Sequence, residues 1–297
     1  MVEYVIQALK ENEIEKWIAF CGGIFSVGPK YFHRHYFNDP NKDFNTIFVM
    51  KNEINEIVST VRIFNREVYI GGKKYKMGGI GEVSTALSYR NRGLSAKVLH
   101  HCVEYMKSND YSISLLGASK YSHYEKQGFM KVKYYNKTIK INRYGEFDIR
   151  KLNANNFNDM EKLYNKYCIV HDMCIVRSSE YWSSWVRNEI KNPYGLFIDN
   201  KLICYMSYDN NMVGEIVGDE LYFDDLLTFI KNDTITIPEF VYTKNEVVNN
   251  SFYSSKMINV FKSIDVDGNG LILDITKDIV EYFNNNRSVV VWRLDSY

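Results

Sequence analysis

The sequence predicts a protein of the α/β (α+β) class, with mixed, mostly antiparallel sheets and flanking helices. From Asn45 onward, the apolar residues of "TIFVMKNEINEIVSTVRIFNREVYI" alternate or run together, as in an antiparallel meander. Between residues 94 and 106 the apolar positions instead fall on one helical stripe. After Asp148 a similar strand–helix layout recurs without repeating the sequence. Together these patterns predict two units of the same kind.

In the first half the expected elements follow one another in order. Residues 1–40 are expected to be helical, and strands follow up to Leu87, with Gly78-Gly79 as a turn before the last strand, residues 80–87. A helix begins near Arg92. After it, "SISLLGA" predicts a buried strand, "YSHYEKQGF" a short helix, and "FMKVKYYNKTIKI" one further strand.

In the second half, "NFNDMEKLYNKYC" and "SSEYWSSWVRNEI" predict helices, the latter with Ser178 as N-cap. Hairpins are expected with turns at Asp199-Asn200 and Asn210-Asn211, followed by a helix in "ELYFDDLLTFIKN". The stretch "DVDGNGLILDIT" imitates a calcium-binding loop. Its twelfth residue is Thr276, where a bidentate Glu is needed, so a hairpin turn at Asn269-Gly270 is favoured.

Composition excludes several function classes. The 297 residues are 45% hydrophobic and 25% charged with a net charge of +1, so nothing points to nucleic acid as a partner. No run of eighteen apolar residues predicts a membrane span, and the N-terminus has no secretion signal. The five cysteines form no CxxC pair, which predicts reduced, mostly buried thiols and a cytoplasmic location. "HRH" lacks a third ligand at diagnostic spacing, so no metal is expected.

One stretch, "YRNRGLSAKVLHHCVEYM", carries the chemistry. A strand runs into a tight turn, and an amphipathic helix begins near Arg92. The first N–H groups of a helix lack intrahelical partners, and the dipole makes this end an anion site. Gly93 and Ser95 keep the approach open, while Arg90 and Arg92 add guanidinium groups that grip phosphate oxygens. The stretch is therefore interpreted as a pyrophosphate cradle.

Two other phosphate-binding motifs do not account for it. The GxxxxGK[ST] loop is absent, and Gly79-x-Gly81 precedes a strand instead of opening a helix. What remains is R-x-x-G-x-S, from Arg90 to Ser95, after a V-S-T strand. This resembles the acetyl-CoA motif [QR]-x-x-G-x-[GA] of the GNAT N-acetyltransferase superfamily, with a small serine in the last position. "LLGASKYSHYEKQGF" follows at the right distance and looks like the family's "YEKLGF" element.

A wider resemblance is to the enhanced-intracellular-survival type of GNAT protein, carried by "GGIGEVSTALSYRNRGLSAKVL", "SLLGAS" and "IVRSSEYW". Members of that group fuse two GNAT folds and a sterol-carrier-like domain. The resemblance implies a catalytic GNAT domain with the acetyl-CoA site over residues 1–145 and a degenerate second GNAT-like domain over 146–254. Residues 255–297 are too short for a full third domain and would be its remnant. The second half contains no R-x-x-G-x-[GAS] motif.

The resemblance also implies roles for individual residues. The backbone near Val83 would supply an oxyanion donor, and Tyr124 would be the general acid for the departing thiolate. For the base, the family's strand positions hold Gly79 and Gly81 here. Glu82 is a candidate base, although it is expected to face the other way because strand side chains alternate. The carboxylate of the chain end, Tyr297, and water relays are the other candidates. The cofactor-binding positions are Val83, Ser84, Thr85, Arg90, Asn91, Arg92, Gly93, Leu94, Ser95, Ala96 and Ser119.

The function implied is an acetyl-CoA-dependent N-acetyltransferase. Its acceptor would be a primary amine of a small molecule, such as an aminoglycoside or polyamine, or of a lysine side chain. The alternative is a non-catalytic acyl-CoA-binding or sensor protein that kept the cradle and lost the chemistry. Aminoacyl transfer is a third possibility, which the intact CoA motif disfavours. Enzymes of the resembled group often assemble, so a homo-oligomer is a further expectation.

Overall fold

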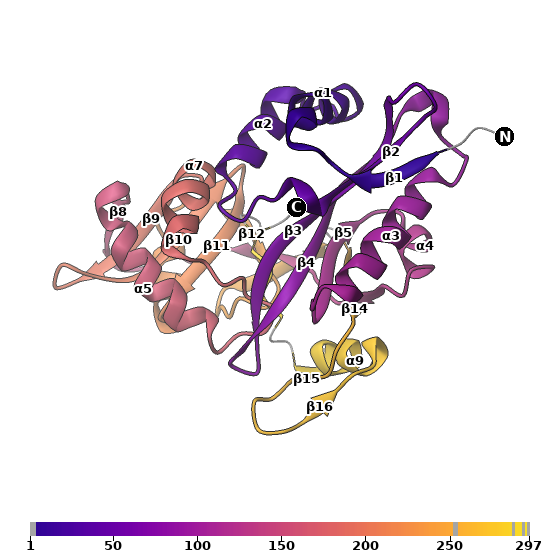
Figure 1. The fold of residues 1–297 in the computed structure, drawn as a ribbon. Helices are drawn as coiled ribbons and strands as arrows, with labels where there is room; N and C mark the ends of the chain where they lie inside the picture. The colour runs from indigo at the N-terminus through magenta and orange to yellow at the C-terminus, as the bar shows by residue number, and fades with distance from the viewer. Residues whose placement is uncertain (1–3, 252–254, 287–288, 293–294, 296–297) are drawn as a thin grey trace.

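Two seven-stranded sheets with flanking helices make up the protein (Figure 1). The computed structural model describes residues 4–251, 255–286, 289–292 and 295. Both sheets are mixed and mostly antiparallel, and in each sheet five strands that are consecutive in sequence lie next to one another, β1–β5 in the first and β8–β12 in the second. The sequence prediction of an α+β class with two units of one kind is therefore confirmed.

The first sheet has the strand order β1-β2-β3-β4-β5-β14-β6. Its strands are β1 (Val5–Ala8), β2 (Ile47–Lys51), β3 (Ile57–Ile70), β4 (Lys73–Thr85), β5 (Ile113–Ala118), β14 (Ser255–Val260) and β6 (Met130–Val132). Neighbouring strands pair antiparallel, with the exception of β4 and β5, which pair in parallel. A crossover is needed between two parallel strands, and the helix α3 supplies it.

The second sheet has the order β13-β7-β12-β11-β10-β9-β8. Its strands are β13 (Glu246–Ser251), β7 (Asn136–Lys140), β12 (Thr234–Pro238), β11 (Met212–Gly218), β10 (Lys201–Asp209), β9 (Pro193–Ile198) and β8 (Asp148–Lys151). Here β11 and β12 form the parallel pair. Counted from β1 in the first sheet and from β8 in the second, the fourth and fifth strands thus form the parallel pair in both halves.

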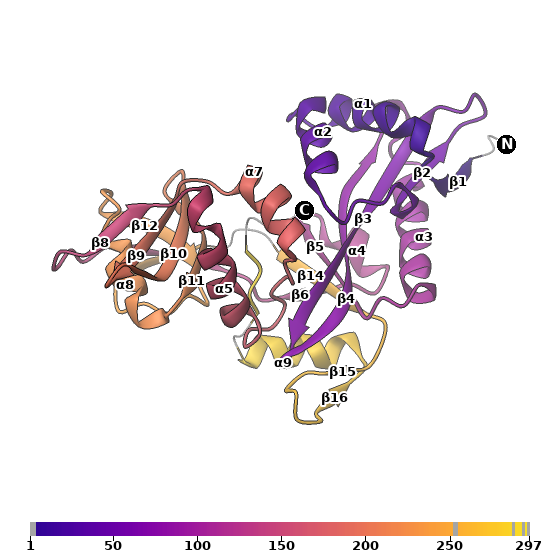
Figure 2. The ribbon, with the colours of Figure 1, turned by 60° about the vertical axis from the view of Figure 1, so that its left-hand side comes forward.

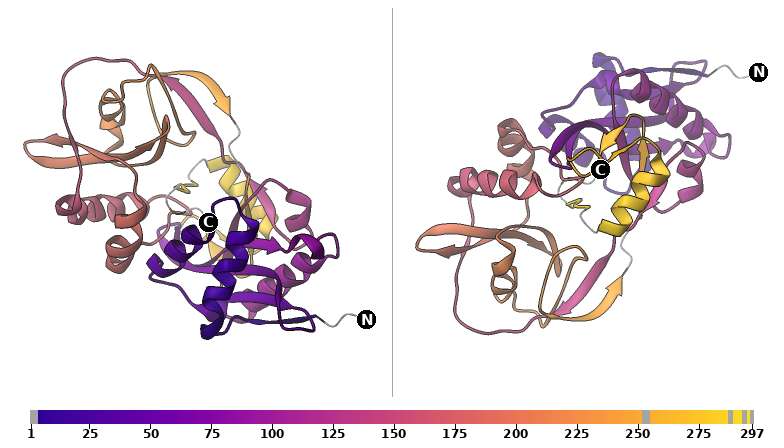
Figure 3. Two further views of the ribbon diagram at one scale, coloured as in Figure 1. Left: turned by 90° about the horizontal axis from the view of Figure 1, so that it is seen from above. Right: turned by 90° about the horizontal axis from the view of Figure 1, so that it is seen from below.

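The two halves exchange one strand each. β6 belongs to the first sheet, yet β7, which follows it closely in sequence, lies in the second sheet between β12 and β13. In return, β14 lies in the first sheet between β5 and β6. Figure 3 shows β7 and β13 running side by side where the chain passes between the halves. Each sheet therefore takes one strand from beyond the predicted boundaries at residues 145 and 254, and those boundaries stay a prediction.

Helices cover the sheets unevenly. They are α1 (Ile14–Ile24), α2 (Pro29–Asn38), α3 (Leu94–Ser108), α4 (Tyr121–Glu125), α5 (Phe157–Cys168), α6 (Ser179–Tyr181), α7 (Arg187–Glu189), α8 (Phe223–Leu227) and α9 (Thr276–Asn286). The apolar stripe of α3 is buried against β3 and β4, and α9 contacts β6 and β14. Figure 2 shows α1 and α2 at one end of the first sheet and α9, with the β15 (Ile264–Asp265) and β16 (Ile272–Leu273) hairpin, at the other.

The predicted turn at Gly78-Gly79 is wrong. β4 runs unbroken from Lys73 to Thr85, and the chain turns at Gly71-Gly72. The glycine at position 78 has another use, because a Cβ there would lie 2.3 Å from the sulfur of Met106. The side chain of Met106 on α3 thus packs directly on the backbone of β4, and a side chain at position 78 would displace it.

Three further expectations need correction. Residues 5–8 form a strand instead of helix, because they pair with β2. The single strand expected over residues 129–141 is two strands in different sheets. Cys168 and Cys174 form a disulfide, since the chain turns back sharply through Met173 (φ 65°) and brings their Cα atoms within 5.4 Å. Reduced thiols were expected at all five positions, and they are found, buried, at the other three.

Several local predictions are confirmed. The hydroxyl of Ser178 accepts a hydrogen bond from the backbone N–H of Tyr181 (3.2 Å) and so caps α6. Residues 199–200 and 210–211 have positive φ at hairpin turns, and residues 269–270 lie in the β15–β16 hairpin. None of the described helices is both long and apolar enough to cross a membrane.

Candidate active site

The site begins where β4 and β5 part. They pair only between Met77–Gly79 and Ile113–Leu115, yet β4 continues to Thr85 and β5 to Ala118. Beyond Gly79 the edge of β4 that faces β5 has no strand partner among the described residues. Backbone N–H and C=O groups left unpaired in this way can bond an extended ligand that lies along the strand.

A β-bulge interrupts β4 at this point. One residue of β3, Val61, lies opposite two residues of β4, Glu82 and Val83, and Glu82 has a φ of 55°. An extra residue in one strand shifts the alternation of its side chains. The expectation that Glu82 faces away from the site assumed a regular strand, and the bulge removes that assumption.

The turn after β4 is shaped for an anion. Asn91 (φ 61°) and Gly93 (φ 72°) both have left-handed backbone, which coils the loop before α3 begins at Leu94. Backbone of this kind turns successive N–H groups toward one point and makes a concave anion site. Within the described part of the chain no side chain caps α3, and, the two chain neighbours aside, no atom lies within 4 Å of where a Cβ on Gly93 would be. The helix start is open to a ligand.

A cavity of about 600 Å³ joins the turn to the bulge and to α4. Nine of the predicted cofactor-binding residues line it: Val83, Ser84, Thr85, Arg90, Asn91, Gly93, Leu94, Ser95 and Ala96. Tyr124 lines it as well, and sequence analysis missed five further residues, Ile24, Phe25, Tyr89, Lys120 and His123. Lys120 and His123 lie in the segment "LLGASKYSHYEKQGF", from which Tyr124 was predicted, so their place near the site could have been predicted as well.

Two predicted cofactor-binding residues lie outside the lining, and so does Glu82, which directly precedes the lining residue Val83. Arg92 turns back onto its own loop: it donates to the carbonyl of Ser88 (2.9 Å) and the hydroxyl of Tyr4 (3.3 Å), and lies over the ring of Tyr89. Arg90 is the guanidinium that lines the cavity. Ser119 follows β5 and is not part of the lining.

Tyr124 lies on the short helix α4 and packs edge-on against Phe129. Burial raises its pKa, so the hydroxyl keeps its proton at neutral pH. The neighbouring His123 has its pKa lowered by burial, and its Nε2 is buried without a hydrogen-bond partner among the described residues. The cavity wall at α4 therefore presents a protonated phenol and a neutral imidazole.

Glu82 is a buried carboxylate at the bulge. Oε1 lies 3.5 Å from a guanidinium nitrogen of Arg62, and Oε2 has no hydrogen-bond partner among the described residues. Burial raises the pKa of Glu82 to about 7, with Arg62 opposing the shift. Arg62 is shared, because it also pairs with the fully buried Asp39 (2.9 Å), which in turn binds Arg66. A carboxyl that titrates near neutral pH suits proton transfer.

Asp295 packs into the second half. Asp295 accepts hydrogen bonds from Arg177 (2.8 Å) and from the hydroxyl of Tyr181 (3.0 Å), and all three side chains are buried. Arg177 also pairs with Glu215. The carboxylate of Asp295 is thus committed to a structural ion pair. Tyr297, whose carboxylate was predicted as a base, lies outside the described residues.

The corresponding connection of the second half has the opposite charge. β11 ends at Gly218, and Asp219 and Glu220 follow where the first half has its arginines. The carboxylate of Asp219 accepts from the N–H of Leu221 (3.1 Å), so this turn is capped by its own side chain. Among the described residues, no group of three or more His, Cys, Asp or Glu side chains is placed to hold a metal ion.

Comparison with known proteins agrees with this geometry. Residues 5–132 match the family model described as acetyltransferase (GNAT) domain. These residues are therefore similar to a GNAT acetyltransferase domain. The match covers less than half of the chain, and no curated protein matches the sequence.

Solved structures extend the likeness of fold to the second half. A GCN5-related N-acetyltransferase from Anabaena variabilis aligns over 88% of this chain and 73% of its own, at 13% identity and a TM-score of 0.69. Eis1 from Mycobacterium abscessus aligns over 93% and 83%, at 12% identity and a TM-score of 0.63. N-myristoyltransferase from Saccharomyces cerevisiae, solved with bound myristoyl-CoA, aligns over 88% and 79%, at 8% identity and a TM-score of 0.58. The fold of these structures therefore extends over both halves of this chain.

Proposed function

We propose that the protein is an acetyl-CoA-dependent N-acetyltransferase that acts on a primary amine. One observation carries the proposal. A single cavity joins the open start of α3, the edge of β4 that has no described strand partner after Gly79, and the half-buried, hydroxyl-bearing side chain of Tyr124. An anion site, a backbone edge and a proton donor are the three things that CoA thioester chemistry requires.

The cofactor would lie along this cavity in a definite direction. Its pyrophosphate would take the N–H groups at the start of α3, with the cations Arg90 and Lys120 beside it. Its pantetheine arm would follow residues 83–85 of β4 toward the bulge. The thioester carbonyl would then come near the N–H of Val83, which supplies the oxyanion donor.

The reaction needs two proton transfers. Glu82 takes a proton from the incoming ammonium, directly or through a water molecule, and the neutral amine attacks the thioester carbonyl. A C–N bond forms, the C–S bond breaks, and Tyr124 gives its proton to the departing thiolate. A carboxyl with a pKa of about 7 and a phenol with a raised pKa have the protonation states that these roles demand. The carboxylate of Tyr297 is the alternative base.

In this proposal the catalytic domain spans residues 1–145 and a degenerate second GNAT-like domain spans 146–254. The second binds no CoA, because carboxylates occupy its corresponding turn. It serves as a wall of the acceptor site. Residues 255–297 would be the remnant of a third, sterol-carrier-like domain, which now supplies β14 to the first sheet.

The second candidate is a non-catalytic acyl-CoA sensor. It is favoured by Gly79 and Gly81, which stand where the resembled enzymes carry an acidic residue or histidine. Glu82 speaks against it, because a buried carboxylate with a free oxygen has no evident structural use.

The deciding experiment is an acetyl-CoA turnover screen across amine classes, read by release of free thiol. Turnover that depends on both an amine and the native residue at position 124 is the expected result. A protein that binds CoA with micromolar affinity, yet releases thiol at the same slow rate with and without every amine, would be a sensor.

A further inference from the structure

A buried lysine lies beside the place where β4 and β5 part. Lys256 of β14 pairs with Gly117 of β5 and is only 6% exposed. Chain neighbours aside, the only described atom within 4 Å of where a Cβ on Gly117 would be is the Nζ of Lys256, at 3.7 Å. The amine of Lys256 therefore lies over the backbone of β5, at a position that has no side chain.

Gly117 lies opposite the β-bulge of β4, across the gap between the two strands. β4 and β5 pair up to Gly79 and Leu115. Counted on in the same register, Gly81, which directly precedes the bulge, is level with Gly117. In the proposed function the thioester carbonyl comes near the N–H of Val83, which belongs to this bulge. The buried amine and the thioester would thus meet at one gap.

The face of the sheet on which this amine lies is bare at the gap. Met77 of β4 and Leu115 of β5 are buried in one apolar cluster with residues of β14 and α9, whereas α3 packs on the opposite face. Because strand side chains alternate, Gly79, Gly81 and Gly117 lie on the same face as Met77 and Leu115. Neither strand places a side chain there, which leaves room for an amine to approach the thioester.

Burial makes the side chain of Lys256 a better nucleophile than an exposed lysine. It lowers the pKa of Lys256 to about 8. At pH 8 about half of these side chains then carry a neutral amine, against roughly one in 250 for an ordinary lysine. The attack on a thioester needs the neutral form, because a protonated amine has no lone pair to donate.

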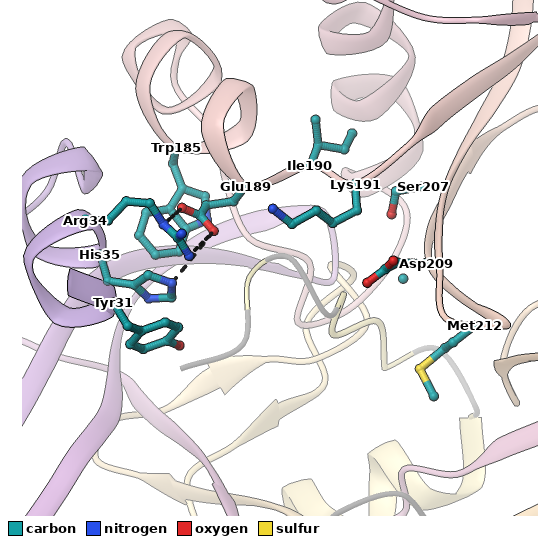
Figure 4. Close-up of a pocket in the computed structure, with 11 residues that line it drawn as sticks. Tyr31, Arg34, His35, Trp185, Glu189, Ile190, Lys191, Ser207, Asp209 and Met212 are labelled. Carbon is teal, nitrogen blue, oxygen red and sulfur yellow. Dashed lines mark hydrogen bonds and ion pairs between the residues drawn. The ribbon is translucent and has the colours of Figure 1, made fainter. Parts of the chain in front are cut away.

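Two other lysines line cavities and serve as references. Lys120 lines the cofactor cavity and is exposed. Lys191, also exposed, lines a second cavity of about 260 Å³ between α2 and the second half. Figure 4 shows Lys191 extending toward Arg34 and Glu189, which pair with each other at 2.8 Å. Burial thus distinguishes Lys256 from both.

We propose that Lys256 is a self-acetylation site of this protein. Its amine takes the acetyl group from bound acetyl-CoA when no external amine occupies the space over Gly117. The inference rests on the proposed function for the place of the thioester, and it adds an acceptor that belongs to the chain itself.

The transfer needs no reactant beyond acetyl-CoA. The neutral Nζ of Lys256 attacks the thioester carbonyl, a C–N bond forms and the C–S bond breaks. Glu82 takes the surplus proton from the nitrogen, directly or through a water molecule, and Tyr124 gives a proton to the thiolate. The products are one Nε-acetyl-lysine and one free CoA thiol.

Mapping of acetyl groups tests the proposal on the native chain. The protein is incubated with acetyl-CoA without any amine, and acetylated lysines are quantified by peptide mass spectrometry. We expect the occupancy at Lys256 to exceed that at Lys120 and at Lys191 by at least about tenfold, because a bound thioester reacts at a high effective concentration. Acetylation confined to exposed lysines would overturn the proposal.

Acetyl phosphate is the matched reagent, since it carries an activated acetyl group without a pantetheine arm. It should modify exposed lysines and show no such preference for Lys256. An equal preference for Lys256 with acetyl phosphate would mean that this lysine reacts without the cofactor site, and the proposal would fall.

Two substitutions assign the acetyl group independently. Lys256→Arg keeps the positive charge and removes the amine, so protein-bound label from radioactive acetyl-CoA should fall by about tenfold or more. Lys191→Arg is the matched control and should keep the label. Label that persists in folded Lys256→Arg protein would place the acetyl group elsewhere. If this variant does not fold, the mapping on the native chain decides.

Failure of the transferase proposal is told apart by thiol release with added amines. Turnover of an amine by a protein whose Lys256 stays unmodified would support the transferase and overturn self-acetylation. Acetylation of Lys256 without turnover of any amine would support self-acetylation and overturn transfer to an external acceptor. A protein that does not bind CoA in calorimetry would overturn both.

Discussion

The two halves place the same kind of connection at the same position in their sheets and give it opposite charge. In the first half, β4 leads through Arg90 and Arg92 into the 15-residue helix α3. In the second, β11 leads through Asp219 and Glu220 into the five-residue helix α8, which carries two more carboxylates. In both, the next strand returns parallel to the one before.

This difference explains why we expect only the connection after β4 to bind a ligand. A helix start needs an acceptor for its first N–H groups. The second half provides one from its own chain, because Asp219 caps the turn. The first half provides none, since α3 begins at Gly93 without a side-chain cap. A phosphate can accept hydrogen bonds from these free N–H groups of α3, and the positive charges of Arg90 and Arg92 attract it.

The largest expected effect comes from placing an acceptor for the first N–H groups of α3 within the chain itself. Gly93→Asp should lower CoA affinity by about 100-fold or more, because the new carboxylate takes the place of the phosphate and repels it. Isothermal calorimetry with CoA measures the change. The substitution would place a carboxylate at the start of α3, as Asp219 does at the turn before α8.

Gly93→Ala is the matched control. It carries the same cost of roughly 1–2 kcal/mol for a left-handed residue with a side chain, and nothing within 4 Å would contact the methyl group. It should lower CoA affinity by less than about tenfold, a loss no larger than that strain. Unchanged affinity in a folded Gly93→Asp protein would refute the cradle.

Next in size is Tyr124→Phe. The ring stays in place and the proton donor is lost, so kcat should fall by about 100-fold, within the range for general acid catalysis. CoA affinity should hardly change. Stopped-flow and steady-state thiol release measure the rate. Full activity would mean that the thiolate takes its proton from elsewhere, for which His123 is the nearest alternative on α4.

A pH profile tests the difference between the two buried ion clusters, that of Glu82 with Arg62 and that of Glu215 and Asp295 with Arg177. Glu215 and Asp295 are each bound by Arg177 and a tyrosine, whereas Glu82 keeps a free oxygen. A base must be deprotonated, so kcat/KM should rise with pH and level off above about 7, the pKa of Glu82.

Glu82→Gln should remove that rise. Activity at pH 8 should fall by about tenfold or more, with CoA affinity retained. A variant that keeps the rise at pH 7 would return the role of base to the chain end or to water.

The smallest expected effect is in the second half. Glu220→Gln removes a carboxylate that is half exposed and 3.5 Å from His171. It should change neither CoA affinity nor kcat, because no cofactor is expected at this turn. A measurable change in CoA affinity would show that the acidic turn takes part after all.

A structural feature can be predicted from the sequence when the residues that produce it lie close together in the chain. The cradle is local, since six consecutive residues make the turn and the helix start, and its position was predictable. Glu82 could be named as a candidate base, but its orientation could not be predicted, because the alternation rule fails at a bulge that only the pairing with β3 creates. Ile24 and Phe25 reach the cavity from a helix far away in sequence, and nothing in their residue type marks them.

The strand exchange was beyond sequence reasoning for a similar reason. "FMKVKYYNKTIKI" alternates without a Gly or Pro to mark a break, yet residues 133–135 carry the chain from one sheet to the other. Which strand lies beside β6 is decided by β14, more than 120 residues later, so no local pattern could predict it.

That exchange ties the catalytic sheet to the order of synthesis. β5 and β6 are both held by β14, so the first sheet stays incomplete until residues 255–260 have left the ribosome. Until then the nascent chain carries an open strand edge beside the future cofactor cavity, a known route to aggregation. A fragment ending at residue 145 should therefore express poorly, and a nonsense mutation anywhere in the second half would remove the first half's function with it.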